Sequence, residues 1–190
     1  MTASSPPVVY IYADESCLGN QYRDRARPGA AAGLLEYRTA SDSWVRRDFW
    51  TSEPDTTNNR MAIRSAILPL SALKRSSRVI FTSDSRYLVD GMTKWVHGWV
   101  RNGWRRKDGA VENVELWQEL LPVARLHQVE WRWVRGHAGH AQNEYANELA
   151  VRAAREQMNS EGLVESAFPQ WLAEEQAEKG RYADFRSGEP

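Results

Sequence analysis

The chain lacks the cysteines for an internal disulfide, since it has one cysteine in 190 residues, and a lone cysteine fits a reducing compartment. It also lacks an apolar stretch long enough to span a membrane. Residues 1–9 hold neither a basic start nor a long apolar run, so no signal peptide is expected. These absences predict a soluble, cytoplasmic protein with no membrane partner.

The chain also lacks a net charge. Lys and Arg number 25, and so do Asp and Glu, which gives a formal net charge of zero. This balance argues against a strongly basic nucleic-acid binder, although a local basic patch can still bind phosphates. There is no internal repeat. A hydrophobic content of 42% allows one substantial core, so the chain is expected to form one domain with extensions and to be a monomer.

Four short segments carry the residues on which a function can be argued. They are YADESCLGN (12–20), TTNNRMA (56–62), FTSDS (81–85) and WVRGHAGHAQNEYANELA (133–150). Together they resemble the ribonuclease HI (RNase H type 1) family. The resemblance implies an endonuclease that hydrolyses the RNA strand of RNA–DNA hybrids by a divalent-metal mechanism. The combination of segments is specific, although no single one is.

Hydrophobic periodicity places these segments on an α/β architecture. Strands are expected at Val8–Glu15, Gly29–Arg38, Trp44–Glu53, Arg78–Asp84 and Gln128–Val134, and helices at 58–73, 85–92, 94–104, 113–125 and 141–157. This order predicts a mixed five-stranded sheet with helices on both faces, plus a C-terminal extension. The resemblance implies that this is the RNase H-like fold. The expected divisions are an N-terminal tail (1–7), an RNase H-like domain (8–156) and the extension (157–190).

Asp14 and Asp84 each stand at the end of an expected strand, where catalytic groups of α/β sheets collect. Hard carboxylate ligands suit Mg²⁺ or Mn²⁺. By resemblance Asp14 bridges two ions and Asp84 holds one of them. Two of the four family carboxylates are replaced, the helix Glu by Ala62 and the last Asp by Asn147, whose amide oxygen can still coordinate. The alternative is therefore a catalytically inactive protein that binds RNA–DNA hybrids.

Glu15 is a candidate to compensate for the missing acids. Adjacent strand residues point to opposite faces of a sheet, so Glu15 is expected to help only if its strand has ended or bulges there. Without such help, restoring Glu at position 62 and Asp at position 147 is expected to raise cleavage.

The remaining candidates bind substrate or transfer protons. His137, in the loop RGHAGH, can accept a proton from the attacking water. The segment 95–107 alternates tryptophans with cations, as nucleic-acid surfaces do, although tryptophans spaced i, i+4 can also simply pack a helix. By resemblance the substrate-binding residues are Cys17, Asn20, Thr57, Asn58, Asn59, Trp95, Trp99 and Asn113.

The C-terminal extension is rich in large apolar residues, with a Pro near a plausible helix start and a Gly that could end the helix. We expect a docked helix or a segment that binds a protein partner. This leaves a third hypothesis, an interaction protein that keeps only the fold. The Asn residues at 58 and 59 and the Trp-rich basic segment argue against it, because a scaffold does not need them.

Overall fold

One twisted sheet forms the centre of the protein in a computed structural model that describes residues 8–19, 27–107, 109–136 and 139–187. Its strands are β1 (Val8–Cys17), β2 (Gly29–Arg38), β3 (Trp44–Glu53), β4 (Arg78–Ser83), β7 (Gln128–Trp133) and β8 (Val164–Glu165), in the order β7-β4-β1-β2-β3-β8. β4 runs parallel to β1 and β7, whereas the other neighbours are antiparallel. The expected mixed sheet is confirmed.

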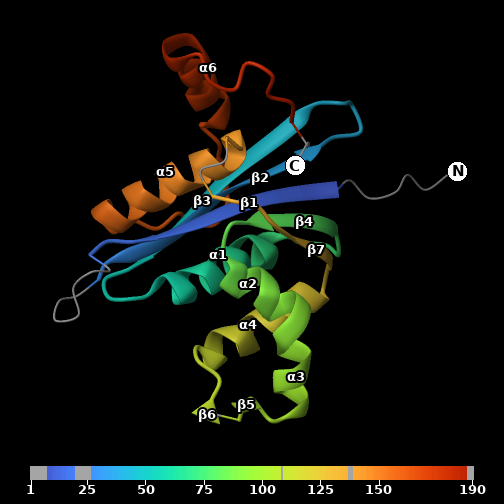
Figure 1. Ribbon diagram of the computed structural model, residues 1–190. Coiled ribbons are helices and arrows are strands. Elements are labelled where there is room, and N and C mark those ends of the chain that lie inside the picture. Colours follow the sequence, from blue (N-terminus) through green and yellow to red (C-terminus); the bar gives the residue numbers. More distant parts are fainter. Residues whose placement is uncertain (1–7, 20–26, 108, 137–138, 188–190) are drawn as a thin grey trace, which may run out of the picture.

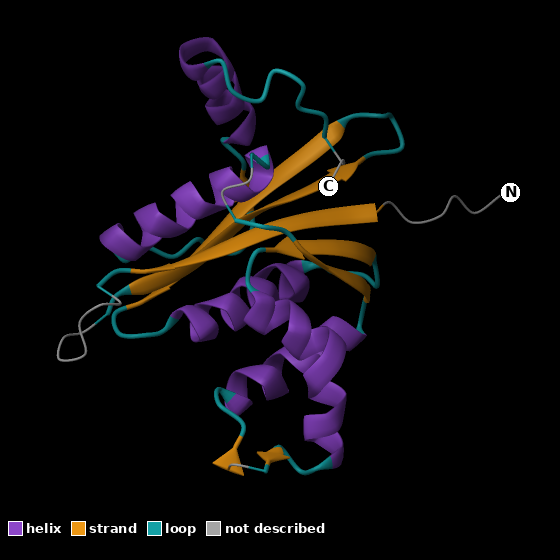
Figure 2. Ribbon diagram, in the orientation of Figure 1, coloured by secondary structure: helices purple, strands orange, loops and turns teal. Residues whose placement is uncertain are grey.

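Helices cover both faces of this sheet (Figures 1 and 2). One face carries α1 (Asn58–Ala72), α2 (Arg86–Asp90) and α4 (Val114–Arg125), and the other carries α5 (Ala141–Glu156), with α6 (Phe168–Lys179) beyond it. A π-helical turn, η1 (Gly91–Trp95), leads from α2 into α3 (Val96–Arg101). Below α3 and α4 in Figure 1 lies a small hairpin of β5 (Arg105–Arg106) and β6 (Gly109–Ala110).

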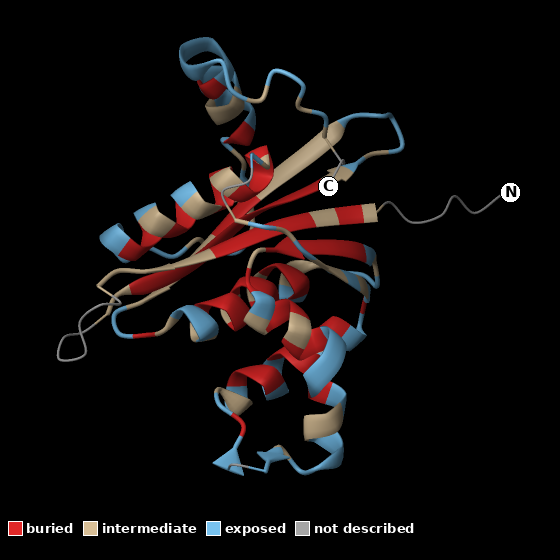
Figure 3. Ribbon diagram, viewed as in Figure 1, coloured by how far each residue is buried: buried red, intermediate tan, exposed pale blue. Residues whose placement is uncertain are grey.

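The alternation of β1 separates two hydrophobic cores. Its odd-numbered residues Ile11 and Ala13 belong to the core that contains Ala62 and Ile63 of α1. Its even-numbered residues point to the opposite face, where the β2 residue Leu34 packs with α5. Buried residues accordingly line both sides of the sheet (Figure 3). A residue's position in β1 therefore decides whether its side chain meets α1 or α5.

The sheet has six strands instead of the five expected from the sequence. The additional strand β8 comes from the C-terminal extension, and its two residues pair antiparallel with Arg47 and Asp48 at the free edge of β3. A two-residue strand has no periodic pattern that sequence reasoning could detect. No helix in the described ranges is long and apolar enough to span a membrane.

The expected helices 85–92 and 94–104 form one continuous helical run from α2 through η1 to α3. Within it, Gly91 lies against the indole of Trp117, and a Cβ at this position would collide with the ring. The missing side chain thus lets η1 and α4 approach closely.

Candidate active site

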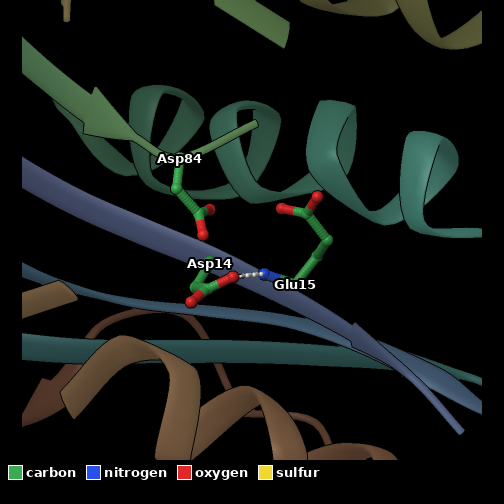
Figure 4. Close-up of side chains that lie close together, drawn as sticks. All are labelled: Asp14, Glu15 and Asp84. Carbon is green, nitrogen blue, oxygen red and sulfur yellow. Dashed lines mark hydrogen bonds between the residues drawn. The ribbon is translucent and has the colours of Figure 1, made fainter. Parts of the chain in front are cut away.

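Three carboxylates meet at the edge of the sheet between β1 and β4 (Figure 4). Asp14 and Glu15 are neighbours in β1, and Asp84 follows the last residue of β4. One carboxylate oxygen from each of the three residues lies within 4.8 Å of the other two. We call these three residues the carboxylate cluster. Such a group of hard, negatively charged oxygens can hold a divalent cation.

The unequal lengths of β1 and β4 explain how the cluster forms. Their pairing ends at Ala13 and Ser83, whereas β1 continues, paired with β2, to Cys17. Beyond Ser83 the edge of β1 is open. Asp14 points to the α5 face and Glu15 to the α1 face, and Asp84 lies at the open edge between them, as Figure 4 shows.

The expectation that Glu15 could reach the other acids only if β1 ended or bulged is therefore wrong, whereas its compensation for missing acids stays a prediction. Glu15 is regularly paired with Ala31, and the strand runs two residues further. Period-two alternation still holds. Side chains from opposite faces can nevertheless converge where a neighbouring strand stops.

Burial and mutual repulsion disfavour the charged form of this cluster. Asp14 is only 6% exposed. Burial, followed by the charge of Asp84, raises its pKa to about 8. The pKa of Glu15 is also raised well above its usual value, again by burial first and then by Asp14 and Asp84. A cation held between the three groups would favour ionised carboxylates and relieve both penalties.

The raised pKa of Asp14 makes the metal-free protein sensitive to pH. A carboxyl whose pKa lies higher in the folded than in the unfolded state stabilises the fold at low pH, and this contribution is lost as pH rises through about 8. Asp14→Asn removes the titration. In EDTA we expect the variant to melt about 5 °C above the wild type at pH 9, with a smaller difference at pH 5.

Calorimetry of both proteins at pH 5, 7 and 9 measures this difference. Mg²⁺ at pH 9 should stabilise the wild type more than Asp14→Asn. A constant difference between wild type and Asp14→Asn across this range would contradict a buried, neutral Asp14.

Asn143, in the first turn of α5, completes the surroundings of Asp14. Its Nδ2 donates to Asp14 Oδ2 at 3.2 Å. Its Oδ1 is buried and finds no hydrogen-bond partner among the described residues, and the same is true of Glu15 Oε2. Two buried oxygens without donors beside a carboxylate cluster are costly in the absence of a cation. The residues present therefore fit a divalent ion.

The two positions at which the resemblance implies a replaced acid lie differently. Ala62 is fully buried in the core on the α1 face, on the same side of the sheet as Glu15. Asn147 lies one turn after Asn143, is partly exposed and lines a cavity of about 600 Å³ with Trp171 of α6. The hydrogen bond from α5 to Asp14 comes from Asn143, a residue that was not among those expected from the sequence.

Gly136 brings the loop after β7 against the cluster. A Cβ at this residue would collide with the Asp84 carboxylate, so only glycine fits without moving that carboxylate. The indole of Trp133 donates to the Asp84 backbone carbonyl at 2.9 Å, which further fixes this residue. His137 follows directly in the chain, but both His137 and Asn20 lie outside the described residues.

Four of the expected substrate residues lie where β1 ends and α1 begins, namely Cys17, Thr57, Asn58 and Asn59. Thr57 caps α1 by accepting from the Arg60 amide, and Asn58 and Asn59 begin the helix with exposed side chains. Cys17 ends β1, half-buried, and burial followed by the charge of Glu15 raises the pKa of its thiol to about 11. This thiol is therefore neutral at physiological pH and suited to contact rather than to nucleophilic attack.

The tryptophans of the expected basic segment form part of an aromatic group. The rings of Trp95 and Trp99 lie 5.7 Å apart, and Trp99 contacts the buried Trp117 at 5.5 Å. Trp95 is 38% exposed and lines a cavity of about 270 Å³ together with Arg106. The packing interpretation is confirmed for Trp99, which connects to the core. Trp95 presents a ring to solvent beside a cation, and its binding to nucleic acid stays a prediction.

Asn113 adopts a left-handed conformation with φ of 55° just before α4, and its side chain donates to the hydroxyl of Tyr87 at 3.2 Å. Trp117 donates to the same hydroxyl. The left-handed conformation favours asparagine at this position, and the hydrogen bond to Tyr87 holds the amide in place. The sequence indicated the residue but not this support.

Comparison with known proteins places this chain in a family. A family model described as RNase H matches residues 6–155. Ribonuclease H of Nitrobacter hamburgensis is 42% identical over 151 residues, which are 79% of this chain and 93% of that protein. Ribonuclease HI of Neisseria meningitidis is 44% identical over 147 residues, covering 77% and 94% of the two chains.

A solved structure is similar over a greater length. LC9-RNase H1, described as a type 1 RNase H with the type 2 active-site motif, has a TM-score of 0.85 and 51% identity, covering 97% of this chain and 98% of that one. The fold, the family model and these relatives agree. The chain with the Asp14–Glu15–Asp84 cluster belongs to the RNase H family.

Proposed function

We propose that this protein hydrolyses the RNA strand of RNA–DNA hybrids with Mg²⁺ or Mn²⁺, and that Glu15 supplies the carboxylate that Ala62 lacks. The observation that carries the proposal is the cluster of Asp14, Glu15 and Asp84 within 4.8 Å. Glu15 lies on the same face of the sheet as Ala62. In this proposal the acid is on β1 instead of α1, and it points to the same face of the sheet.

The proposed ligands come from three elements. Asp14 and Glu15 on β1 and Asp84 after β4 would hold the ion, and the amides of Asn143 and Asn147 are the candidates from α5. When bound, the ion supplies Lewis-acid stabilisation of the scissile phosphate and lowers the pKa of water. The chain itself supplies the negative charge and excludes water from Asp14, and His137 is the proposed acceptor of the water proton.

The substrate would lie across the ends of β1 and α1 and the aromatic group. We assign Cys17, Asn20, Asn58 and Asn59 to the groove of the hybrid, where 2′-hydroxyls distinguish RNA from DNA. Thr57 and Asn113 would contact a phosphate of the DNA strand. Trp95 and Trp99 would press on its sugars, with Arg106 nearby.

The direct test is cleavage of end-labelled duplexes of about 20 base pairs, long enough to span the proposed contacts. We expect Mg²⁺-dependent cleavage of the RNA–DNA hybrid with no cleavage of duplex DNA, and steep loss of hybrid affinity with salt despite zero net charge. Removal of the metal with EDTA should abolish cleavage but leave hybrid binding measurable.

The second candidate function is hybrid binding without cleavage, which the loss of charge at positions 62 and 147 favours. Binding of the hybrid in preference to duplex DNA, with no cleavage in either metal, would establish it. Equal affinity for both duplexes at moderate salt would count against both candidates.

A further inference from the structure

The C-terminal extension contacts the helix that reaches Asp14. Phe168 of α6 is fully buried in a core formed with Leu34 of β2 and Tyr145 and Leu149 of α5. The ring of Tyr145 contacts Phe168 and Trp171, in each case with centroids 5.3 Å apart. The extension therefore packs on α5 through Tyr145, two residues after Asn143.

Polar contacts make Tyr145 a junction between three parts of the chain. Its hydroxyl donates to Asp48 Oδ2 of β3 at 2.5 Å, and the same oxygen accepts the backbone N–H of Ala167, just before α6, at 3.1 Å. Tyr145 and Asp48 are both buried. A buried hydrogen bond to a carboxylate is strong and directional, so this contact fixes the position of α5 relative to the sheet.

The position of α5 matters because the helix holds Asp14. The Nδ2 of Asn143 must stay within hydrogen-bond distance of Asp14 Oδ2, now 3.2 Å. A small shift of the first turn of α5 would lengthen this bond and let the Asp14 carboxylate rotate. Misplacement of one ligand weakens a metal site.

We propose that Tyr145, held by Asp48 and the C-terminal extension, is a positioning residue for the metal site and acts through Asn143 on Asp14. This inference rests on the proposed divalent-metal site and adds that residues outside the family-matched range 6–155 help to form it. Tyr145 touches neither metal nor substrate in this scheme.

The test is a double-mutant cycle in the full-length protein, read by calorimetric titration of Mn²⁺ without substrate. Tyr145→Phe removes only the hydroxyl. In the wild-type background we expect it to weaken Mn²⁺ binding about two- to tenfold, the range of one hydrogen bond. In the Asn143→Ala background, which is itself weakened, we expect Tyr145→Phe to have no further effect on affinity.

Two further variants separate positioning from general stability. Asp48→Asn should weaken Mn²⁺ binding in the same direction as Tyr145→Phe. Asn159→Ala is the matched control, because Asn159 accepts from the Ser52 amide at 2.7 Å and fastens the extension to β3 just after the C-terminal end of α5, at the end opposite to Asn143. It should lower the melting temperature without changing Mn²⁺ affinity.

Each result decides the proposal. Unchanged Mn²⁺ affinity in Tyr145→Phe or Asn143→Ala, additive effects in the double variant, or an equal loss in Asn159→Ala would overturn it. These outcomes leave the proposed function intact, since the wild type still binds Mn²⁺. Absence of Mn²⁺ binding to the wild type would instead reject the metal site itself, and this inference with it.

Discussion

Glu15→Gln should reduce Mg²⁺-dependent cleavage of an RNA–DNA hybrid about a thousandfold, as fully as Asp14→Asn. The variant keeps the shape of the side chain but removes one of the three charges that meet within 4.8 Å. Correct placement of a Lewis-acid ion is worth several kcal/mol of transition-state stabilisation, and each factor of ten in rate corresponds to about 1.4 kcal/mol. The effect is measured as a single-turnover rate, with the protein in excess over the hybrid and above the dissociation constant.

Glu148→Gln is the matched control on α5. Glu148 is exposed and accepts the Trp171 indole N–H at 2.9 Å, a contact that an amide oxygen can also make. Its cleavage rate should stay within about twofold of the wild type. If Glu15→Gln cleaves like the wild type whereas Asp14→Asn does not, Glu15 is not a ligand, and the site works with two carboxylates.

The second large effect concerns position 62. We expect Ala62→Glu alone to lower both the melting temperature and cleavage, because it adds a fourth carboxylate to a fully buried position on the face that Glu15 occupies. This reverses the expectation from the sequence, in which Glu restored at position 62 compensated for a missing ligand. In the proposed site Glu15 already fills that role.

An acid introduced at position 62 should restore part of the cleavage rate that is lost when Glu15 is removed. Glu15→Ala is expected to cut cleavage about a thousandfold, and Ala62→Glu in the same chain should recover at least about tenfold of that loss. Ala66→Glu is the matched control, since Ala66 is also fully buried on α1 but one turn further along the helix. It should destabilise the protein without recovery. Higher cleavage in Ala62→Glu alone would refute the exchange.

Much of the fold follows from local sequence patterns. β2 and β3 have the bounds expected from alternation and composition, and α1 begins at Asn58 after the Thr57 cap. Long elements with a buried face repeat their pattern often enough to be recognised. β8 does not, since its pairing depends on a docked extension that brings two residues to the edge of β3.

The candidate site was predictable in part. The sequence indicates Asp14 and Asp84, and the cluster contains both, although β1 runs on to Cys17 and Asp14 follows only the end of its pairing with β4. Period-two alternation disfavours Glu15, but this rule does not keep side chains apart where a neighbouring strand stops. Asn143 is one helical turn before Asn147 and so shares its side of α5, a spacing that could have indicated it. Which of two such amides reaches Asp14 depends on the packing of α5, which no local pattern encodes.

The early end of β4 has a consequence for how such enzymes diverge. β1 extends beyond its pairing with β4 from Asp14 to Cys17. Side chains from both faces of this one strand can therefore reach the same cluster. In the proposed site, an acid lost from α1 is replaced by one on β1 without a change in the backbone. Homologues judged inactive because one alignment column lacks its acid should therefore be re-examined at the neighbouring column of the strand.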